Sequence, residues 1–223
     1  KIFWTREETS YGGGLGMMIL EPRWKSYIVA TNQAIFTPEQ CDHIIRMGQS
    51  AKQIDAKVGT STQDKVDTDP TIVKNTGVND TKKRITKISW LPFNSPECAP
   101  MYEKINGWVK NININHFGFD GIQITENAQY TEYPKDAFYT WHTDNDTDMR
   151  LQPPVRKISM TLLLSDEKDF EGGDLEMIDD EKRPRMKRGH AIFFASFIRH
   201  RVTPVTKGNR KSLVMWFGGP PFK

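Results

Sequence analysis

The stretch "GIQITENAQYTEY" (residues 121–133) is where the sequence changes from helical to strand periodicity. After it come short segments rich in β-branched and aromatic residues: "AFYTWHTD", "RKISMTLLLS", "DLEMI", "HAIFFAS", "HRVTPVT" and "RKSLVMWFG". Such residues favour strands, and "FEGGD" and "TKGN" supply turns between them. The second half of the chain therefore predicts many short strands.

Two helices are expected before this run of strands. In "FTPEQCDHIIRMGQSAK" (residues 36–52), Thr37 can cap the helix, Pro38 suits the first helical position and Gln40 can close a capping box. In "APMYEKINGWVKNINI" (residues 99–114), apolar residues recur at spacings of three to four. Both segments are predicted to form amphipathic helices.

Helices followed by many strands predict a mainly β protein with supporting helices. We expect a jelly-roll core, the double-stranded β-helix, over about residues 121–218, with the N-terminal helices packed on one sheet. Residues 1–30 are expected to form an N-terminal arm or first strand, and residues 31–223 a single domain.

Composition sets bounds on partners and compartment. Lys and Arg number 31 against 28 for Asp and Glu, a net charge of +3, too small an excess to indicate nucleic acid or an anionic membrane as a partner. The chain has no apolar run of ~18–20 residues and no visible signal-peptide pattern. We therefore expect a cytoplasmic protein, although the opening Lys1 leaves room for a trimmed leader. Cys41 and Cys98 are expected to be free buried thiols.

The candidate chemistry begins at "YTWHTDND" (residues 139–146), which places His142 and Asp144 two residues apart. Alternate residues of a strand share a face, so both side chains could reach one metal ion. By itself the pair could equally be a hydrogen-bonded pair at a strand end. The candidates for a third ligand are His116, His190, His200, Asp146 and Asp148.

His200 is the favoured third ligand because of the segment that follows it, "HRVTPVTKGNRKS" (residues 200–212). If residues 205–209 form the loop of a hairpin, His200 lies opposite Val214, and the even-numbered residues share a face. That face would carry His200, Arg210, Ser212 and Trp216. His190 has no basic residue on a following strand to support it and is interpreted as structural.

Two histidines and one carboxylate leave metal positions open, an arrangement suited to non-haem Fe(II) oxygen chemistry. A zinc hydrolase could use similar ligands, but it would need a carboxylate base and has no use for Arg210. A buried guanidinium pairs well with a carboxylate. A calcium loop starting at Asp144 is rejected, because Met149 occupies the position that requires Gly.

These residues resemble the motif of the 2-oxoglutarate- and Fe(II)-dependent dioxygenases: His-x-Asp, a distal His, a basic residue ten positions on and a Ser two further. "RITKISWLP" (residues 84–92) and "QYTEYPKDAFYTWHTD" (residues 129–144) also resemble segments of the prolyl 4-hydroxylase branch. The resemblance covers most of residues 30–218. Two positions depart from it, since many members of this branch have Lys at position 210 and Tyr at position 163, here Arg210 and Leu163.

The resemblance implies a cofactor and a co-substrate. Fe(II) would be held by His142, Asp144 and His200. 2-Oxoglutarate would be held by Arg210, Tyr133 and Ser212, with O₂ as the oxidant and ascorbate as the reductant that keeps the iron reduced.

The resemblance also implies a substrate, a prolyl residue in a peptide or protein, contacted by Arg156 and Trp216. Arg156 could instead be a solvated arginine at a strand start, and Trp216 simply part of the core. The loop at residues 58–70 is expected to be either a substrate lid or a solvated connection. Two alternatives stay open: the same chemistry on a small molecule or another residue type, and a metal-binding jelly roll without catalysis.

Overall fold

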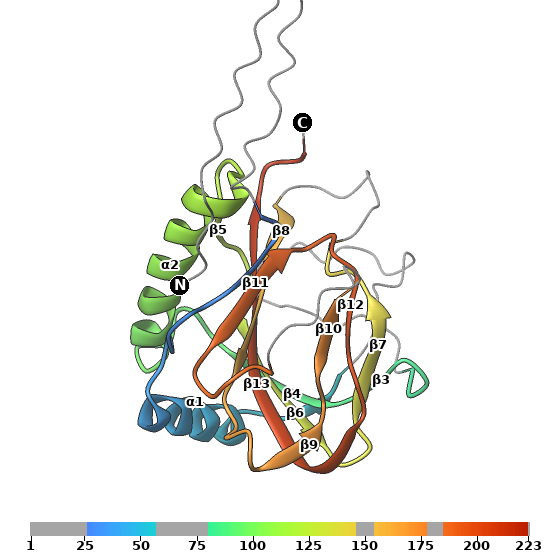
Figure 1. Ribbon diagram of the computed structural model, residues 1–223. Coiled ribbons are helices and arrows are strands. Elements are labelled where there is room, and N and C mark those ends of the chain that lie inside the picture. Colours follow the sequence, from blue (N-terminus) through green and yellow to red (C-terminus); the bar gives the residue numbers. More distant parts are fainter. Residues whose placement is uncertain (1–25, 57–79, 146–153, 178–184, 223) are drawn as a thin grey trace, which may run out of the picture.

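The computed structural model describes residues 26–56, 80–145, 154–177 and 185–222. Two antiparallel sheets face each other, and the two helices lie on the far side of the larger one (Figure 1). The larger sheet has the strand order β1-β11-β8-β13-β6-β4-β2, and the smaller has the order β10-β12-β7-β3. This is the expected mainly β, jelly-roll architecture with helices on one sheet.

The larger sheet is built from β1 (Ile28–Ala30), β2 (Ile54–Asp55), β4 (Lys87–Leu91), β6 (Ala128–Pro134), β8 (Val155–Leu163), β11 (Ala191–Ala195) and β13 (Val205–Gly219), with β5 (Gln123–Ile124) and β9 (Phe170–Gly172) paired to β13. The smaller sheet is built from β3 (Arg84–Ile85), β7 (Phe138–His142), β10 (Leu175–Met177) and β12 (His200–Val202). The helices are α1 (Pro38–Ser50) and α2 (Ala99–Ile112), and α2 continues into the π-helical turn η1 (Asn113–Phe117).

Helix α1 begins as the sequence predicts. The Thr37 hydroxyl accepts from the Gln40 amide N–H, and the Gln40 side chain accepts from the Thr37 amide N–H, at 3.3 and 3.1 Å. This reciprocal capping box satisfies two amide donors that the first helical turn leaves free.

The larger sheet separates an apolar layer from a polar one. Along β8, Ile158, Met160 and Leu162 belong to the hydrophobic core that also contains helix residues such as Ile44 and Ile105. The intervening residues and their neighbours on β13 are small and polar yet buried: Ser159, Thr161 and Ser212. Because side chains alternate across a strand, the helices cover the apolar face and the polar face looks toward the smaller sheet.

The predicted hairpin between residues 200–204 and 210–216 is wrong. β12 pairs with β7 and β10, whereas β13 pairs with β6 and β8 and sets Arg210 opposite Tyr133. The chain crosses from the smaller to the larger sheet at Thr203 and Pro204, so the residues on either side belong to different sheets. The even-numbered face of β13 still points inward, with Arg210 and Ser212 both buried.

The predicted strand at residues 121–133 needs correction, and most of the predicted N-terminal arm lies outside the described residues. The stretch at residues 121–133 forms two strands, β5 and β6, rather than one. Part of the expected N-terminal arm is the strand β1, while residues 1–25 and the loop at residues 58–70 lie outside the described residues. Cys41 and Cys98 are free and buried as predicted, and burial raises the pKa of the Cys41 thiol to about 11.

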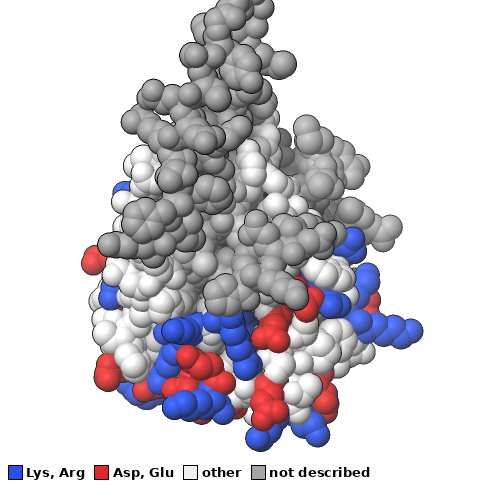
Figure 2. Space-filling view, in the orientation of Figure 1, with Lys and Arg blue, Asp and Glu red and all other residues white. Residues whose placement is uncertain are grey.

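The described surface carries charges of both signs. On the face in Figure 2, Lys and Arg intermingle with Asp and Glu over the lower end of the molecule. Within the described ranges, neither helix is long and apolar enough to cross a membrane.

Candidate metal centre and carboxylate pocket

The side chains of His142, Asp144 and His200 converge between the two sheets. The Nε2 atom of His142 lies 3.5 Å from one carboxylate oxygen of Asp144, and the Nε2 atom of His200 lies 3.6 Å from the other. The three potential ligand atoms are all within 4.8 Å of one another. The structure therefore brings together the three residues predicted to hold a metal, and the metal itself stays a prediction.

Strand pairing places the two histidines together, since His200 on β12 lies opposite His142 on β7. The sequence predicted that Asp144 lies on the same strand as His142. In the structure β7 ends at His142, and Asp144 lies in the bend that follows. The Asp144 amide N–H donates to the Ser196 carbonyl at 2.9 Å. A loop anchored on Ser196, rather than strand alternation, turns the carboxylate toward the histidines.

Both imidazole rings are oriented by backbone carbonyls. The Nδ1 atom of His142 lies 2.8 Å from the Thr140 oxygen, and that of His200 lies 3.0 Å from the Ile198 oxygen. A carbonyl oxygen can only accept, so Nδ1 carries the proton in each ring. Each Nε2 then presents a lone pair to the centre, which is the tautomer that binds a metal.

Burial and neighbouring charges shift the pKa values of His200 and Asp144 in this cluster. Burial lowers the pKa of His200, and the nearby Asp144 carboxylate opposes that shift in part. Burial of Asp144 opposes ionisation of its carboxyl, but the neighbouring His200 and His142 outweigh it and lower the pKa of Asp144 well below its usual range. Two imidazoles and one carboxylate form a ligand set that fits a divalent cation.

Arg210 is a buried cation on β13 of the larger sheet. It is 2% exposed, its Nη1 donates to the Ser212 hydroxyl at 3.1 Å, and its guanidinium carbon lies 5.4 Å from the Tyr133 ring centroid. Among the described residues, no carboxylate lies within salt-bridge distance of it. Burial lowers the pKa of Arg210. A charged group in this position calls for an anionic partner.

A small cavity adjoins the Arg210 guanidinium. Its apolar walls are Leu163, Phe170, Leu175 and Met186. Arg185 and Asp174 also line it, as an exposed ion pair 3.5 Å apart. Leu163 stands where the resembling branch often has Tyr, so this wall presents hydrocarbon in place of a hydroxyl. The cavity combines one buried cation with apolar walls, as a short dicarboxylate would require.

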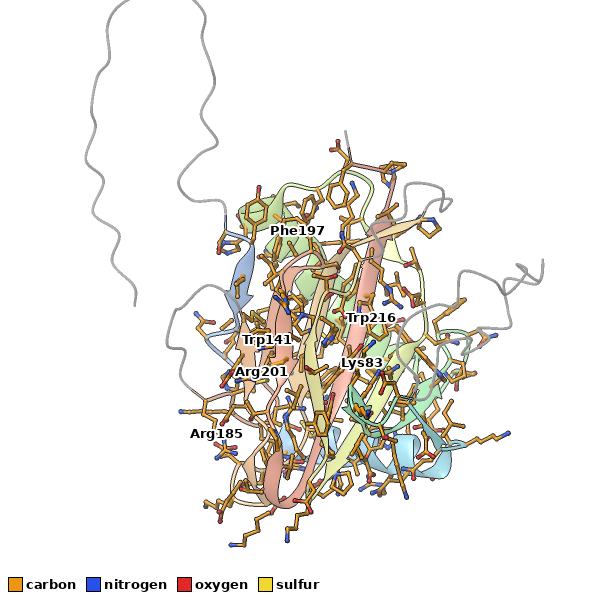
Figure 3. The ribbon with its side chains drawn as sticks, turned by 90° about the vertical axis from the view of Figure 1, so that its right-hand side faces the viewer. Lys83, Trp141, Arg185, Phe197, Arg201 and Trp216 are labelled. Carbon is orange, nitrogen blue, oxygen red and sulfur yellow. The ribbon has the colours of Figure 1, made fainter. Side chains whose placement is uncertain are left out.

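Arg156 and Trp216, the two predicted substrate contacts, lie together, but the Arg156 guanidinium already binds other residues of the protein. The guanidinium forms a two-point ion pair with Glu126, stacks on the Trp216 ring at 4.1 Å and donates to the Asp144 carbonyl at 3.2 Å. The indole N–H of Trp216, a residue only 7% exposed and labelled in Figure 3, has no partner among the described residues. Glu126 was missed because no motif distinguishes it from other loop acids.

Tyr139 is a second residue that the sequence did not single out. Its ring stacks on the His142 imidazole, with centroids 3.5 Å apart and planes at 17°. The pairing of β7 with β12 shifts register between these residues. This β-bulge lets side chains three positions apart face the same interior.

The remaining candidates for a third ligand do not join the cluster. The Nδ1 atom of His190 lies 3.1 Å from the Thr31 carbonyl, a structural contact as expected. His116 belongs to η1. Asp146 and Asp148 lie outside the described residues. Trp141 lies on the outer side of β7, with the Arg201 guanidinium 4.9 Å from its ring (Figure 3).

Known proteins resemble the part of the chain that carries this cluster. The model of the 2OG-Fe(II) oxygenase superfamily matches residues 128–218. A PKHD-type hydroxylase of Idiomarina loihiensis is 39% identical over 87 residues, 38% of each chain. One of Gloeothece citriformis is 44% identical over 89 residues, 39% of this chain and 40% of the relative. The alignments span about two fifths of these curated relatives.

Solved structures resemble more of the chain. A viral collagen prolyl hydroxylase of Paramecium bursaria Chlorella virus-1, in complex with 2OG, has a TM-score of 0.62 at 16% identity, covering 87% of this chain and 97% of its own. A Pseudomonas putida prolyl-4-hydroxylase has a TM-score of 0.58 at 20% identity, covering 87% and 94%. Likeness at this identity establishes the fold. Residues 128–218 thus match the model of the 2OG-Fe(II) oxygenase superfamily, and the chain shares the fold of these prolyl hydroxylase structures.

Proposed function

We propose that the chain is an Fe(II)- and 2-oxoglutarate-dependent hydroxylase that acts on prolyl residues of a peptide or protein and releases succinate and CO₂. The observation that carries this proposal is a combination: Arg210 is a buried cation without a carboxylate partner among the described residues, and the same fold gathers two histidines and one carboxylate into one cluster. A metal-binding module without catalysis has no need of that arginine.

Three side chains would hold the iron: His142 and His200 through Nε2, and Asp144 through its carboxylate. Three ligands leave other metal positions open for the co-substrate and O₂. When bound there, iron with 2-oxoglutarate and O₂ supplies the oxidising power that converts a C–H bond to C–OH. The carbonyl contacts at Nδ1 hold both imidazoles in the ligating tautomer throughout.

Arg210 and its neighbours would bind the distal carboxylate of 2-oxoglutarate. The guanidinium provides a charge-assisted fork, Ser212 holds one of its nitrogen atoms, and Tyr133 lies against its face. The apolar walls of the cavity, Leu163 and Phe170 among them, exclude water and so strengthen the pairing.

On the substrate side, Trp216 offers a buried indole N–H that lacks a partner among the described residues. Arg156 orients the Trp216 ring and the Asp144 backbone together. The choice of a prolyl substrate rests on likeness to prolyl hydroxylases, one of them a Trichoplax adhaerens enzyme in complex with a hypoxia inducible factor peptide fragment. Ascorbate is proposed as the reductant on the same ground.

The test is turnover by purified protein supplied with Fe(II), 2-oxoglutarate, ascorbate and proline-containing peptides. We expect succinate formation coupled to a +16 mass change on proline. His200→Ala should abolish iron retention and turnover, while His43→Ala, on the exposed face of α1, should preserve both. Wild-type turnover by His200→Ala would refute the site, and absence of both succinate and modified peptide would refute the activity.

A further inference from the structure

Arg84 is a second buried guanidinium in the space between the sheets. It is 9% exposed and extends from β3 of the smaller sheet to β6 of the larger. Its Nε donates to the Thr86 hydroxyl at 2.9 Å and its Nη2 to the Gln129 side-chain oxygen at 3.0 Å. Both acceptors are neutral. Within the described ranges, no carboxylate lies at ion-pair distance from Arg84.

The guanidinium of Arg84 lies close to the metal-ligand cluster. Its central carbon is 4.5 Å from the Tyr139 ring centroid, and the Tyr139 centroid is 3.5 Å from that of His142. Together these distances place the guanidinium carbon at most 8.0 Å from the His142 ring centroid. A group bound by Arg84 would therefore lie within reach of a substrate whose reacting carbon approaches the metal.

Among the charges of the described residues, Arg84 is left unmatched once the proposed cofactor and co-substrate are bound. Glu126 neutralises Arg156, and Asp174 neutralises Arg185. The iron and Arg210 together would carry three positive charges, and Asp144 with the two carboxylates of 2-oxoglutarate would carry three negative charges, so this set is neutral. In the part of the chain that the structure describes, one positive charge then remains, that of Arg84, and a buried charge without a counter-charge is costly.

We infer that Arg84 recognises a carboxylate carried by the substrate. The inference rests on the proposed function and narrows its substrate class to molecules with an anionic group close to the carbon that is hydroxylated. A carboxylate suits the fork geometry and the single excess charge, whereas a phosphate monoester would bring close to two charges. Its source is either an acidic side chain next to the reacting residue or a terminal carboxylate.

Two matched pairs of substrates test the inference in the wild-type protein. The first pair is a blocked proline peptide with Glu beside the proline and the same peptide with Gln. The second is a peptide ending in proline with a free carboxylate and the same peptide as its amide. We expect the carboxylate member of one pair to have a KM about ten-fold lower or better, the effect of a charge-assisted hydrogen bond. The pair that shows this difference in KM identifies whether the recognised carboxylate is a side chain or a chain terminus.

Arg84→Gln should erase this preference by raising KM for the carboxylate substrate alone, with kcat nearly unchanged. Arg84→Lys, which keeps the charge but loses the fork, should retain part of it. The control is Lys83→Gln, the exposed neighbour labelled in Figure 3, which should keep the full preference. Equal KM values within both pairs in wild type would overturn the inference, as would an equal rise for all substrates in Arg84→Gln.

A binding measurement separates this inference from the proposed function. Calorimetric titration of the same four peptides into protein with Fe(II) and 2-oxoglutarate under nitrogen requires no turnover. If no peptide is hydroxylated, the prolyl hydroxylase proposal fails. The inference about Arg84 is then supported if the carboxylate member of a pair binds more tightly and the Arg84→Gln variant loses this difference. It is overturned if the two members of each pair bind with equal affinity.

Discussion

At the residue scale, Arg210 offers the most direct test of the co-substrate pocket. Arg210→Gln removes the cation that would face the distal carboxylate of 2-oxoglutarate. Losing one partner of a buried charge pair costs about 2–5 kcal/mol, so we expect KM for 2-oxoglutarate to rise by about thirty-fold or more. The KM is obtained by measuring the rate of succinate formation as a function of 2-oxoglutarate concentration.

The matched control for this variant is Lys207→Gln on the same strand, whose ammonium pairs with Glu171 in solvent. It should keep the wild-type KM. A KM unchanged in Arg210→Gln would place the co-substrate carboxylate elsewhere.

Glu126 is predicted to matter for stability through Arg156. Glu126→Gln keeps the shape of the side chain but removes the charge opposite a guanidinium that also stacks on Trp216. Because the pair is partly solvated, we expect a loss of about 1–2 kcal/mol in the free energy of unfolding, measured by urea denaturation. Glu171→Gln, in an exposed pair, should change it by less than about 0.5 kcal/mol. Equal effects of the two variants would contradict this assignment.

Sequence reasoning located residues that belong to a linear motif and missed those that the fold brings to it. The motif of His142, Asp144, His200 and Arg210 predicted that the three ligand candidates meet, although the predicted hairpin and the strand alternation that were expected to bring them together are wrong. Glu126 and Arg84 come from other strands and loops, and only the assembled sheets place them near the cluster. Nothing in a single sequence separates them from ordinary charged residues.

At the scale of elements, the contact between α1 and the larger sheet depends on a glycine. A Cβ atom at Gly48 would lie 2.2 Å from the Tyr130 ring, which is fully buried. Gly48→Ala must push the helix and β6 apart, so we expect a loss of about 1–3 kcal/mol in unfolding free energy.

The control is Gly107→Ala in α2, where a Cβ atom meets nothing within 4 Å. In that exposed helical position alanine should stabilise by about 0.5–1 kcal/mol. Thermal and urea denaturation of both variants gives the comparison. A destabilisation in Gly107→Ala equal to that in Gly48→Ala would show that packing against Tyr130 is not the cause.

Element types were easier to predict than element partners. The capping box at Thr37 and the strand at residues 156–165 are encoded by nearby residues. The partner of β12 is not, because Thr203 and Pro204 can equally form a hairpin turn or a crossing between sheets. The bulge in β7 is also invisible in the alternation of "AFYTWHTD", since it arises from pairing with β12.

At the scale of the whole molecule, Glu132 links α1, β6 and β13. Its carboxylate accepts hydrogen bonds from Tyr130, Gln49 and Asn209 at 2.6, 3.0 and 3.1 Å. Burial opposes ionisation, but these hydrogen bonds outweigh it and lower the pKa of Glu132. A lowered pKa means that the stabilisation is present above the unfolded-state value, near 4.3, and is lost as the pH falls through the folded-state value.

Stability should therefore decline as the pH falls from 5 to 3, and Glu132→Gln should make that decline shallower. Urea denaturation at pH 7, 5, 4 and 3 measures the free energy of unfolding for both proteins. Glu171→Gln, which removes a carboxylate that stays in water, should keep the wild-type slope. A Glu132→Gln slope as steep as wild type would assign the acid sensitivity to other carboxylates.

Strands β8 and β13 each have one apolar face and one hydroxyl-lined face, and the two faces have different surroundings. The apolar side packs against the helices, while the hydroxyl-lined side faces the smaller sheet, whose strands carry His142 and His200. Under the proposed function, substitutions on the hydroxyl-lined side would change the substrate space and leave the apolar layer against the helices unaltered. A library restricted to Ser159, Thr161, Gln129 and Val214 is thus a starting point for redirecting this scaffold to new molecules.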